Sequence, residues 1–197
     1  MKEADRNLAS AVVVAAWAVV ACAIGAAMFG VGDSKSANAA VSMRAPISAN
    51  GSPNMVREAA LAVERETRCL TDAIYHEARS ESEAGQMAVA EVVLNRVSSG
   101  RYADTICGVV YQGADRVTGC QFSFTCDGSL KAAIEPVAWG RAERVAKDVI
   151  LGHRRNLVGD ATHYHADYVD PLWAGSYSRS VRIGKHIFYA DNTETRG

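Results

Sequence analysis

Glu77 is the residue whose type and spacing best suit acid chemistry. If residues 67–81 form a helix, one of its faces carries residues three and four positions apart, namely Leu70, Ala73, Ile74, Glu77, Ala78 and Glu81. A carboxyl group in such an apolar stripe loses hydration, so its pKa rises and it stays partly protonated near neutral pH. General acid catalysis requires that protonated state. The pattern therefore indicates an enzyme; the alternative is a structural carboxylate that an arginine or backbone N–H groups satisfy.

The segments next to Glu77 should be long helices. Residues 55–66 are charged and rich in Ala, so we expect them to extend the Glu77 helix toward its N-terminus. Residues 83–97 are apolar on most sides and predict the central core helix. The few polar residues of this second helix should mark its solvent or cleft side: Gln86, Glu91, Asn95 and Arg96.

Shorter elements follow. A short helix over residues 107–111 and a longer one over residues 136–151 are expected from caps and apolar spacing. Residues 163–165 and 180–189 are β-prone and aromatic, and Gly184 fits a turn. We therefore predict an α+β fold, mainly helical, with a small β element.

The cysteines indicate an oxidising compartment. Cys69, Cys107, Cys120 and Cys126 lie in the expected domain, whereas Cys22 lies in an apolar N-terminal run. An even set downstream of an export signal favours two disulfides, and three pairings are possible. The short spacing of Cys120 and Cys126 permits a local bridge, which would leave Cys69 with Cys107. Four reduced, buried cysteines are the alternative.

The N-terminal region divides the chain into three parts. Residues 8–31 carry no charge and are long enough to cross a bilayer. We therefore expect a signal-anchor or transmembrane segment over residues 1–31, a flexible linker over 32–54 and a catalytic domain over 55–197. A cleaved signal peptide is the alternative. The net charge is −1 without a basic block, so we expect no binding to nucleic acid. The protein is expected to be a monomer.

Three separated segments resemble one family when they are taken in order. They are Tyr75–Glu81 (YHEARSE), Cys120–Gly128 (CQFSFTCDG), and Ala161–His165 (ATHYH) followed by Gly184–Tyr189 (GKHIFY). Together, over about residues 69–191, they resemble the spore-cortex-lytic type of cell wall hydrolase, the SleB/CwlJ-like family. The resemblance implies a lysozyme-like α+β fold, and cleavage of peptidoglycan between N-acetylmuramic acid and N-acetylglucosamine. It also implies that Glu77 is the catalytic acid, although Ser80 stands where the family usually has Gly.

The resemblance further implies a lytic transglycosylase with a single catalytic Glu and no cofactor or metal. In that reaction, cleavage of the glycosidic bond makes the muramic acid oxocarbenium-like, and the 6-hydroxyl of the same sugar captures this cation. A muramidase would need a second carboxylate, for which Glu81 and Asp127 are the candidates. Aromatic, amide and charged side chains should hold the glycan, and the expected set is Arg79, Glu81, Gln86, Gln121, Phe122, Ser123, Asp127, Tyr164, His165 and Trp173.

Two other functions remain open. His163, His165 and Asp167 alternate along an expected strand and would share one face, as zinc ligands can. A zinc-dependent amidase or endopeptidase would then cut the peptide of the cell wall. A wall-binding module without catalysis would keep the aromatic groove and not need Glu77.

The composition of residues 8–31 bears on location. Nine Ala and two Gly among 24 residues make its preference for hydrocarbon shallow. The segment resembles the signal-anchor-release helices of some phage endolysins. That resemblance implies an inner-membrane protein with its catalytic domain in the periplasm, released on depolarisation to lyse the host, and Cys22 could then exchange with a bridge of the domain. The alternative is a permanently anchored bacterial hydrolase.

Overall fold

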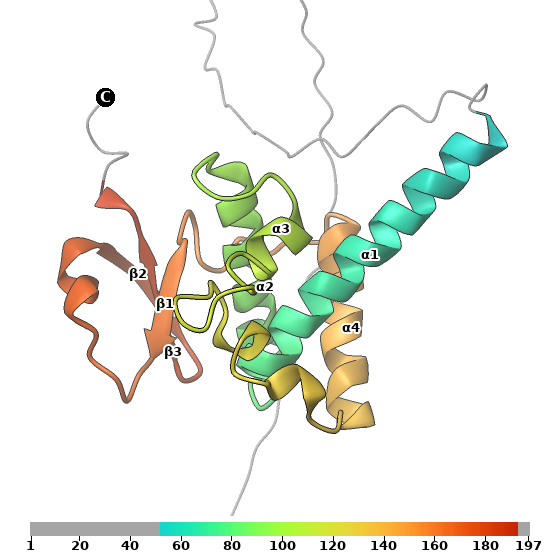
Figure 1. Cartoon of the computed structure of the whole chain (residues 1–197). Helices are drawn as coiled ribbons and strands as arrows, with labels where there is room; N and C mark the ends of the chain where they lie inside the picture. The colour runs from blue at the N-terminus through green and yellow to red at the C-terminus, as the bar shows by residue number, and fades with distance from the viewer. Residues whose placement is uncertain (1–51, 193–197) are drawn as a thin grey trace, which may run out of the picture. The chain divides into compact units, whose positions relative to one another are not determined.

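A computed structural model describes residues 52–192, which form a helical body and a small sheet (Figure 1). The α-helices are α1 (Pro53–Ala78), α2 (Glu83–Ser98), α3 (Ile106–Val110) and α4 (Pro136–Ile150). The strands are β1 (His163–Ala166), β2 (Ser178–Ile183) and β3 (His186–Ala190). Short 3-10 helices cover Ser123–Thr125, Ser129–Lys131 and Leu172–Ser176. This architecture confirms the mainly helical α+β class.

The expected membrane segment, residues 1–31, and most of the linker, residues 32–54, lie outside the described residues. Helix α1 starts at Pro53, which occupies its first turn. Within residues 52–192, no helix combines the length and the apolar character that a bilayer crossing requires.

Helix α1 is continuous, as expected, and carries Glu77 in its last turn. Its N-terminal half is exposed and projects from the body, whereas Leu70 and Ile74 near its other end are fully buried. The expected position of Glu81 on the same helix face is wrong. The helix ends at Ala78, and the chain turns before Ser82, whose side chain accepts the N–H of Gly85 and starts α2.

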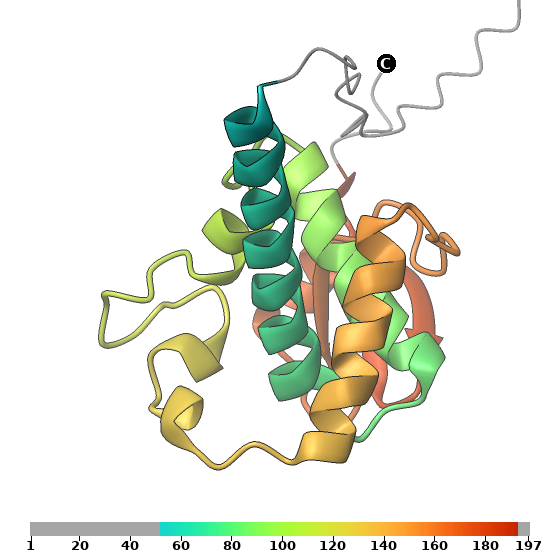
Figure 2. The same ribbon diagram turned by 90° about the vertical axis from the view of Figure 1, so that its right-hand side faces the viewer.

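Helix α2 lies between the sheet on one side and α1 and α4 on the other (Figures 1 and 2). The expected solvent or cleft position of its polar side chains is therefore wrong for three of them. Gln86, Glu91 and Arg96 are 1%, 0% and 5% exposed. Each is buried with backbone partners in another segment, because a polar group removed from water costs free energy unless it is hydrogen-bonded.

The sheet is antiparallel in the order β1-β3-β2, and Gly184 forms the turn between β2 and β3 at φ +56°. One face packs on α2, where Phe188 joins a buried cluster with Ala88 and Val92. Tyr164 packs against this cluster from the edge strand β1. Because strand residues alternate between faces, the neighbours of Tyr164 in β1 point to the other side of the sheet.

Both disulfides that the spacing suggested are present. Cys69–Cys107 joins α1 to α3, and Cys120–Cys126 closes the loop that precedes α4. Closing loops of 38 and 6 residues in the unfolded chain is worth about 4 and about 2 kcal/mol in the chain-entropy model. The first bridge fastens the helix that carries Glu77, and the second shapes the loop beside it.

Candidate active site

Glu77 lies partly buried at the end of α1, facing the edge strand of the sheet. Its Oε2 accepts a hydrogen bond of 3.1 Å from the hydroxyl of Tyr164, a residue 87 positions away in the sequence. Burial raises the pKa of Glu77, while the Tyr164 hydrogen bond and the charge of Arg96 act in the opposite direction. The net effect is upward, which is what a general acid needs near neutral pH.

Tyr164 is held for this contact by the inner face of the sheet. Its ring lies 5.6 Å from that of Phe188 and meets His186 edge-on at 5.3 Å. Burial, with Glu77 beside it, raises the pKa of Tyr164 well above its ordinary value. The phenol therefore stays protonated and keeps donating to Glu77.

The disulfide-closed loop brings a second carboxylate to the site. Asp127 is exposed and interacts electrostatically with both Glu77 and His76. Hydrogen bonds from Ser129, and then from Ser123, lower the pKa of Asp127. Glu77 and Asp127 thus form a pair whose pKa values are pushed apart, an arrangement that separates an acid from an ionised carboxylate.

Glu81 lies against the turn between β2 and β3. Its Oε2 accepts the backbone N–H of Lys185 at 3.3 Å, and a Cβ at Gly184 would overlap this carboxylate oxygen. Glycine is required there both for this approach and for the positive φ. Glu81 therefore holds the β2–β3 turn next to His186.

Four other residues expected at the substrate have partners within the protein. Gln86 is buried and donates to the carbonyl of Ala78, so it shapes the turn after α1. Phe122 is buried, with the guanidinium of Arg96 5.1 Å from its ring centre. Gln121 is half-buried, and its backbone N–H donates to the carbonyl of Gln112. Arg79 pairs with Glu135 and has its guanidinium over the ring of Tyr75.

His165 and Trp173 face away from Glu77. Because Tyr164 points to the helices, His165 must lie on the outer face of the sheet, where its Nε2 is 2.9 Å from the hydroxyl of Tyr189. Trp173 covers this face in ring contact with His163, His165, Tyr177 and Tyr189. The five rings form a small aromatic core on the far side of the sheet from the acid.

The three residues of the zinc alternative, His163, His165 and Asp167, do not form a metal-binding cluster. His165 is engaged by Tyr189 and by the carbonyl of Ala166, and Asp167 lies past the end of β1 in an ion pair with Arg182. Across residues 52–192, no three His, Cys, Asp or Glu side chains stand close enough to share a metal ion.

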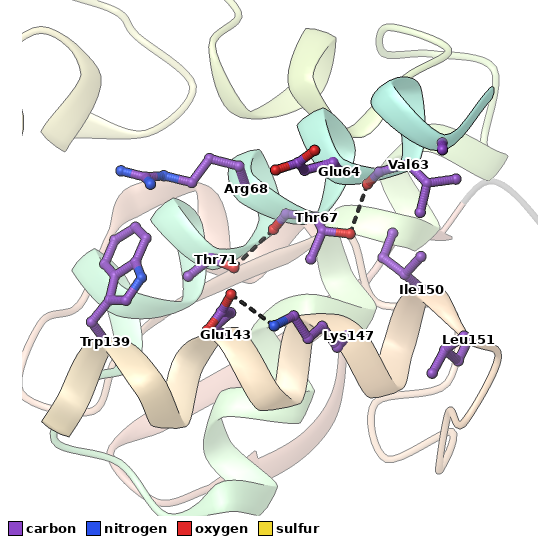
Figure 3. A pocket seen from close by; sticks show the side chains of 11 residues that line it. Val63, Glu64, Thr67, Arg68, Thr71, Trp139, Glu143, Lys147, Ile150 and Leu151 are labelled. Atoms are coloured by element: carbon purple, nitrogen blue, oxygen red, sulfur yellow. Dashed lines mark hydrogen bonds and ion pairs between the residues drawn. The ribbon is translucent and has the colours of Figure 1, made fainter. Parts of the chain in front are cut away.

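A cavity of about 510 Å³ lies elsewhere, between α1 and α4 (Figure 3). Its polar side chains bind one another or the backbone: Glu143 pairs with Lys147 at 2.8 Å, and the hydroxyl of Thr67 donates to the carbonyl of Val63. The lining of this cavity contains none of the residues that the sequence singled out for catalysis or substrate binding.

Sequence reasoning did not assign Arg96 and His186 to the site. Arg96 acts on Glu77 through its charge, and His186 packs against Tyr164. The alternation of strand residues could have indicated His186, since a residue two positions from Phe188 shares its face. No pattern in α2 distinguishes Arg96 from an exposed arginine.

Comparison with known proteins agrees with this combination of a helical body and a small sheet. The model of the family described as Cell Wall Hydrolase matches residues 80–189, a segment that begins three residues after Glu77. The chain belongs to this family. That finding confirms the spore-cortex-lytic type of cell wall hydrolase that the ordered motifs resemble.

Spore cortex-lytic enzymes are among its curated relatives. Those of Halalkalibacterium halodurans and Oceanobacillus iheyensis are each 32% identical over 126 residues, or 64% of this chain, and the enzyme of Bacillus subtilis is 31% identical over 122 residues. The matched segments make up 34%, 41% and 36% of those proteins, so this chain spans less than half the length of each.

Two solved structures have a similar fold. The catalytic domain of the Bacillus cereus SleB protein is 30% identical, with a TM-score of 0.51, and the match covers 64% of this chain and 90% of that domain. The catalytic domain of the germination-specific lytic transglycosylase SleB from Bacillus anthracis is also 30% identical, with a TM-score of 0.51, and 63% and 93% are covered.

Proposed function

We propose that this protein cleaves the glycan of peptidoglycan between N-acetylmuramic acid and N-acetylglucosamine, as a lytic transglycosylase with Glu77 as its catalytic acid. The observation that carries the proposal is the partly buried Glu77 carboxyl group, whose pKa is raised and which Tyr164 orients. The description of the Bacillus anthracis relative as a lytic transglycosylase supports the reaction type. The protein would act as a monomer on glycan strands.

The reaction needs one proton donor that later becomes an acceptor. Glu77 gives its proton to the glycosidic oxygen while the bond from that oxygen to C1 of the muramic acid breaks. The 6-hydroxyl of the same sugar then attacks C1 and returns its proton to Glu77. The products are a 1,6-anhydro end and a free 4-hydroxyl, and no water is consumed.

The structure offers one alternative to intramolecular capture. Asp127 is an exposed carboxylate whose pKa is lowered, so it is ionised and could orient a water molecule toward C1, as in a muramidase. We propose that Asp127 and Ser123 contact the glycan on the loop side, with Tyr164 on the sheet side.

The products of purified peptidoglycan digestion test the proposal. We expect mass spectrometry to show muropeptides with anhydro-muramic ends, each lighter by one water than the hydrolysed form, and activity that EDTA does not remove. Reducing muramic ends would instead indicate a muramidase that uses Asp127. New free amino groups, or activity lost to EDTA and restored by zinc, would contradict the glycosidase assignment.

We also propose that residues 8–31 hold the protein in the inner membrane, with the domain in the periplasm. The support is their uncharged length and small side chains. Release of such a weak anchor would suit an endolysin. Cells that produce the protein should yield it full-length in the membrane fraction, and an uncoupler should move it to the soluble periplasm. Retention in the membrane would indicate a permanent anchor, and a shortened soluble form present from the start would contradict the proposal.

A further inference from the structure

Arg96 is a buried cation with an incomplete set of hydrogen bonds. It lies in α2 and is 5% exposed, and its Nε donates to the carbonyl of Thr162 at 2.8 Å. Its buried Nη1 has no hydrogen-bond partner within the described residues. An unpaired donor on a buried guanidinium costs free energy of folding. A functional role of Arg96 would explain why the fold retains it.

Aromatic rings shield Arg96 from water, and this strengthens the effect of its charge on neighbouring groups. Its guanidinium carbon lies 5.1 Å from the ring centre of Phe122 and 5.5 Å from that of Tyr102. Aromatic faces attract a cation without neutralising it. In such a poorly hydrated setting, a charge acts more strongly on its neighbours than it would in water.

The position of Arg96 links it to the Glu77 contact in two ways. Its hydrogen bond holds Thr162, two residues before Tyr164, at the start of the strand that brings the tyrosine hydroxyl to Glu77. Its charge acts on both Glu77 and Tyr164. Arg96 is thus the cation that faces the acid from α2, while Tyr164 faces it from β1 and Asp127 from the loop.

We propose that Arg96 is a positioning residue for Glu77 that acts through its buried charge. When the proton moves from Glu77 to the glycosidic oxygen, a carboxylate is left in a poorly hydrated site. The guanidinium of Arg96 stabilises this carboxylate, together with the Tyr164 hydroxyl, until the 6-hydroxyl returns a proton. This inference rests on the proposed role of Glu77.

Neutral substitutions of Arg96 in the full-length chain test the inference. Arg96→Gln can still donate to Thr162 without the charge, and Arg96→Met keeps most of the stem. We expect each to lower kcat by roughly 10- to 100-fold, the value of a hydrogen bond or charge contact to an ionised group. The activity loss at high pH should move to higher pH, because Glu77 then holds its proton more tightly. Arg96→Lys keeps the charge, so it should restore part of kcat and part of the original position of the high-pH limb.

The control is Arg57→Gln, which removes an equal charge from the exposed half of α1. It should leave kcat and the pH profile unchanged. If the Arg96 variants fold but lose activity without moving the high-pH limb upward, the inference is wrong and Arg96 is only structural. A fully active Glu77→Gln would instead overturn the proposed function itself, so the two failures are distinguishable.

A measurement on the unsubstituted full-length chain covers the case in which these variants do not fold. In protein labelled with ¹³C-glutamate and ¹⁵N-arginine, the Arg96 Nε resonance should shift at the pH at which the Glu77 carboxyl carbon titrates. The shift should vanish in Glu77→Gln. An Arg96 resonance that stays constant through the Glu77 titration would overturn the inference.

Discussion

Glu77→Gln should lower the rate of peptidoglycan cleavage by roughly 10²- to 10⁴-fold, the usual contribution of a general acid. Glutamine has nearly the same shape and can still accept the Tyr164 hydrogen bond, but it cannot deliver a proton. The measurement is the release of soluble muropeptides from purified peptidoglycan. Glu58→Gln, the same change in the exposed half of α1, should retain full activity. A Glu77→Gln variant as active as the unchanged protein would contradict the assignment of the acid.

Thermal melting shows whether Glu77→Gln loses activity because the proton donor is missing or because the protein misfolds. Burial raises the pKa of Glu77 above 4.5, so the folded state binds this proton more tightly than the unfolded state. The free energy of unfolding therefore falls as the pH rises from the unfolded pKa through the folded one. Glutamine has no ionisable proton, so it does not cause this fall in the free energy of unfolding. Glu77→Gln should thus melt at a higher temperature than the unchanged protein at pH 7, with the difference shrinking below pH 4.5.

Glu91→Gln should destabilise the domain by roughly 3–5 kcal/mol, although Glu91 takes no part in the proposed chemistry. Glu91 is fully buried in α2, and its carboxylate accepts the backbone N–H groups of Arg155, Leu157 and Val158 at 3.0, 2.7 and 3.3 Å. An amide in its place turns an NH₂ group toward one of these donors. The three N–H groups then compete for one oxygen, and the loop that contains Arg155, Leu157 and Val158 is held less firmly to α2.

Urea unfolding at pH 7 measures this effect as a lower midpoint. Glu64→Gln, an exposed glutamate of α1, is the matched control and should unfold at the midpoint of the unchanged protein. Because Val158 belongs to the cluster under the sheet, Glu91→Gln should also loosen the sheet. An unchanged midpoint would show that the three hydrogen bonds contribute little to stability.

Local patterns indicated the candidate acid and the elements around it. The spacing of three and four residues placed Glu77 beside an apolar stripe, and α1 does carry it at the edge of the core. Pro136 marked the start of α4, and Gly184 marked the turn between β2 and β3. These features depend on backbone preferences and periodicity within a few residues, which a sequence displays directly.

Tertiary packing decided the rest of the site. The sequence contains Tyr164, His165 and Trp173 as equal candidates, but only the pairing of β1 with β3 decides that Tyr164 meets Glu77 and that the other two face away. The polar residues of α2 look like a solvent face, yet the sheet and two helices cover them.

The sequence by itself therefore indicated the family, the helical class and the candidate acid, because each depends on residue order or short-range spacing. It left three cysteine pairings open, and the structure contains Cys69–Cys107 and Cys120–Cys126. Only the tertiary structure decided which distant groups surround that acid. Glu77 receives its hydrogen bond from a residue 87 positions away, and it feels the charge of Arg96 from a different helix. Contacts between distant residues depend on how whole elements pack, and no local period of the sequence encodes that packing.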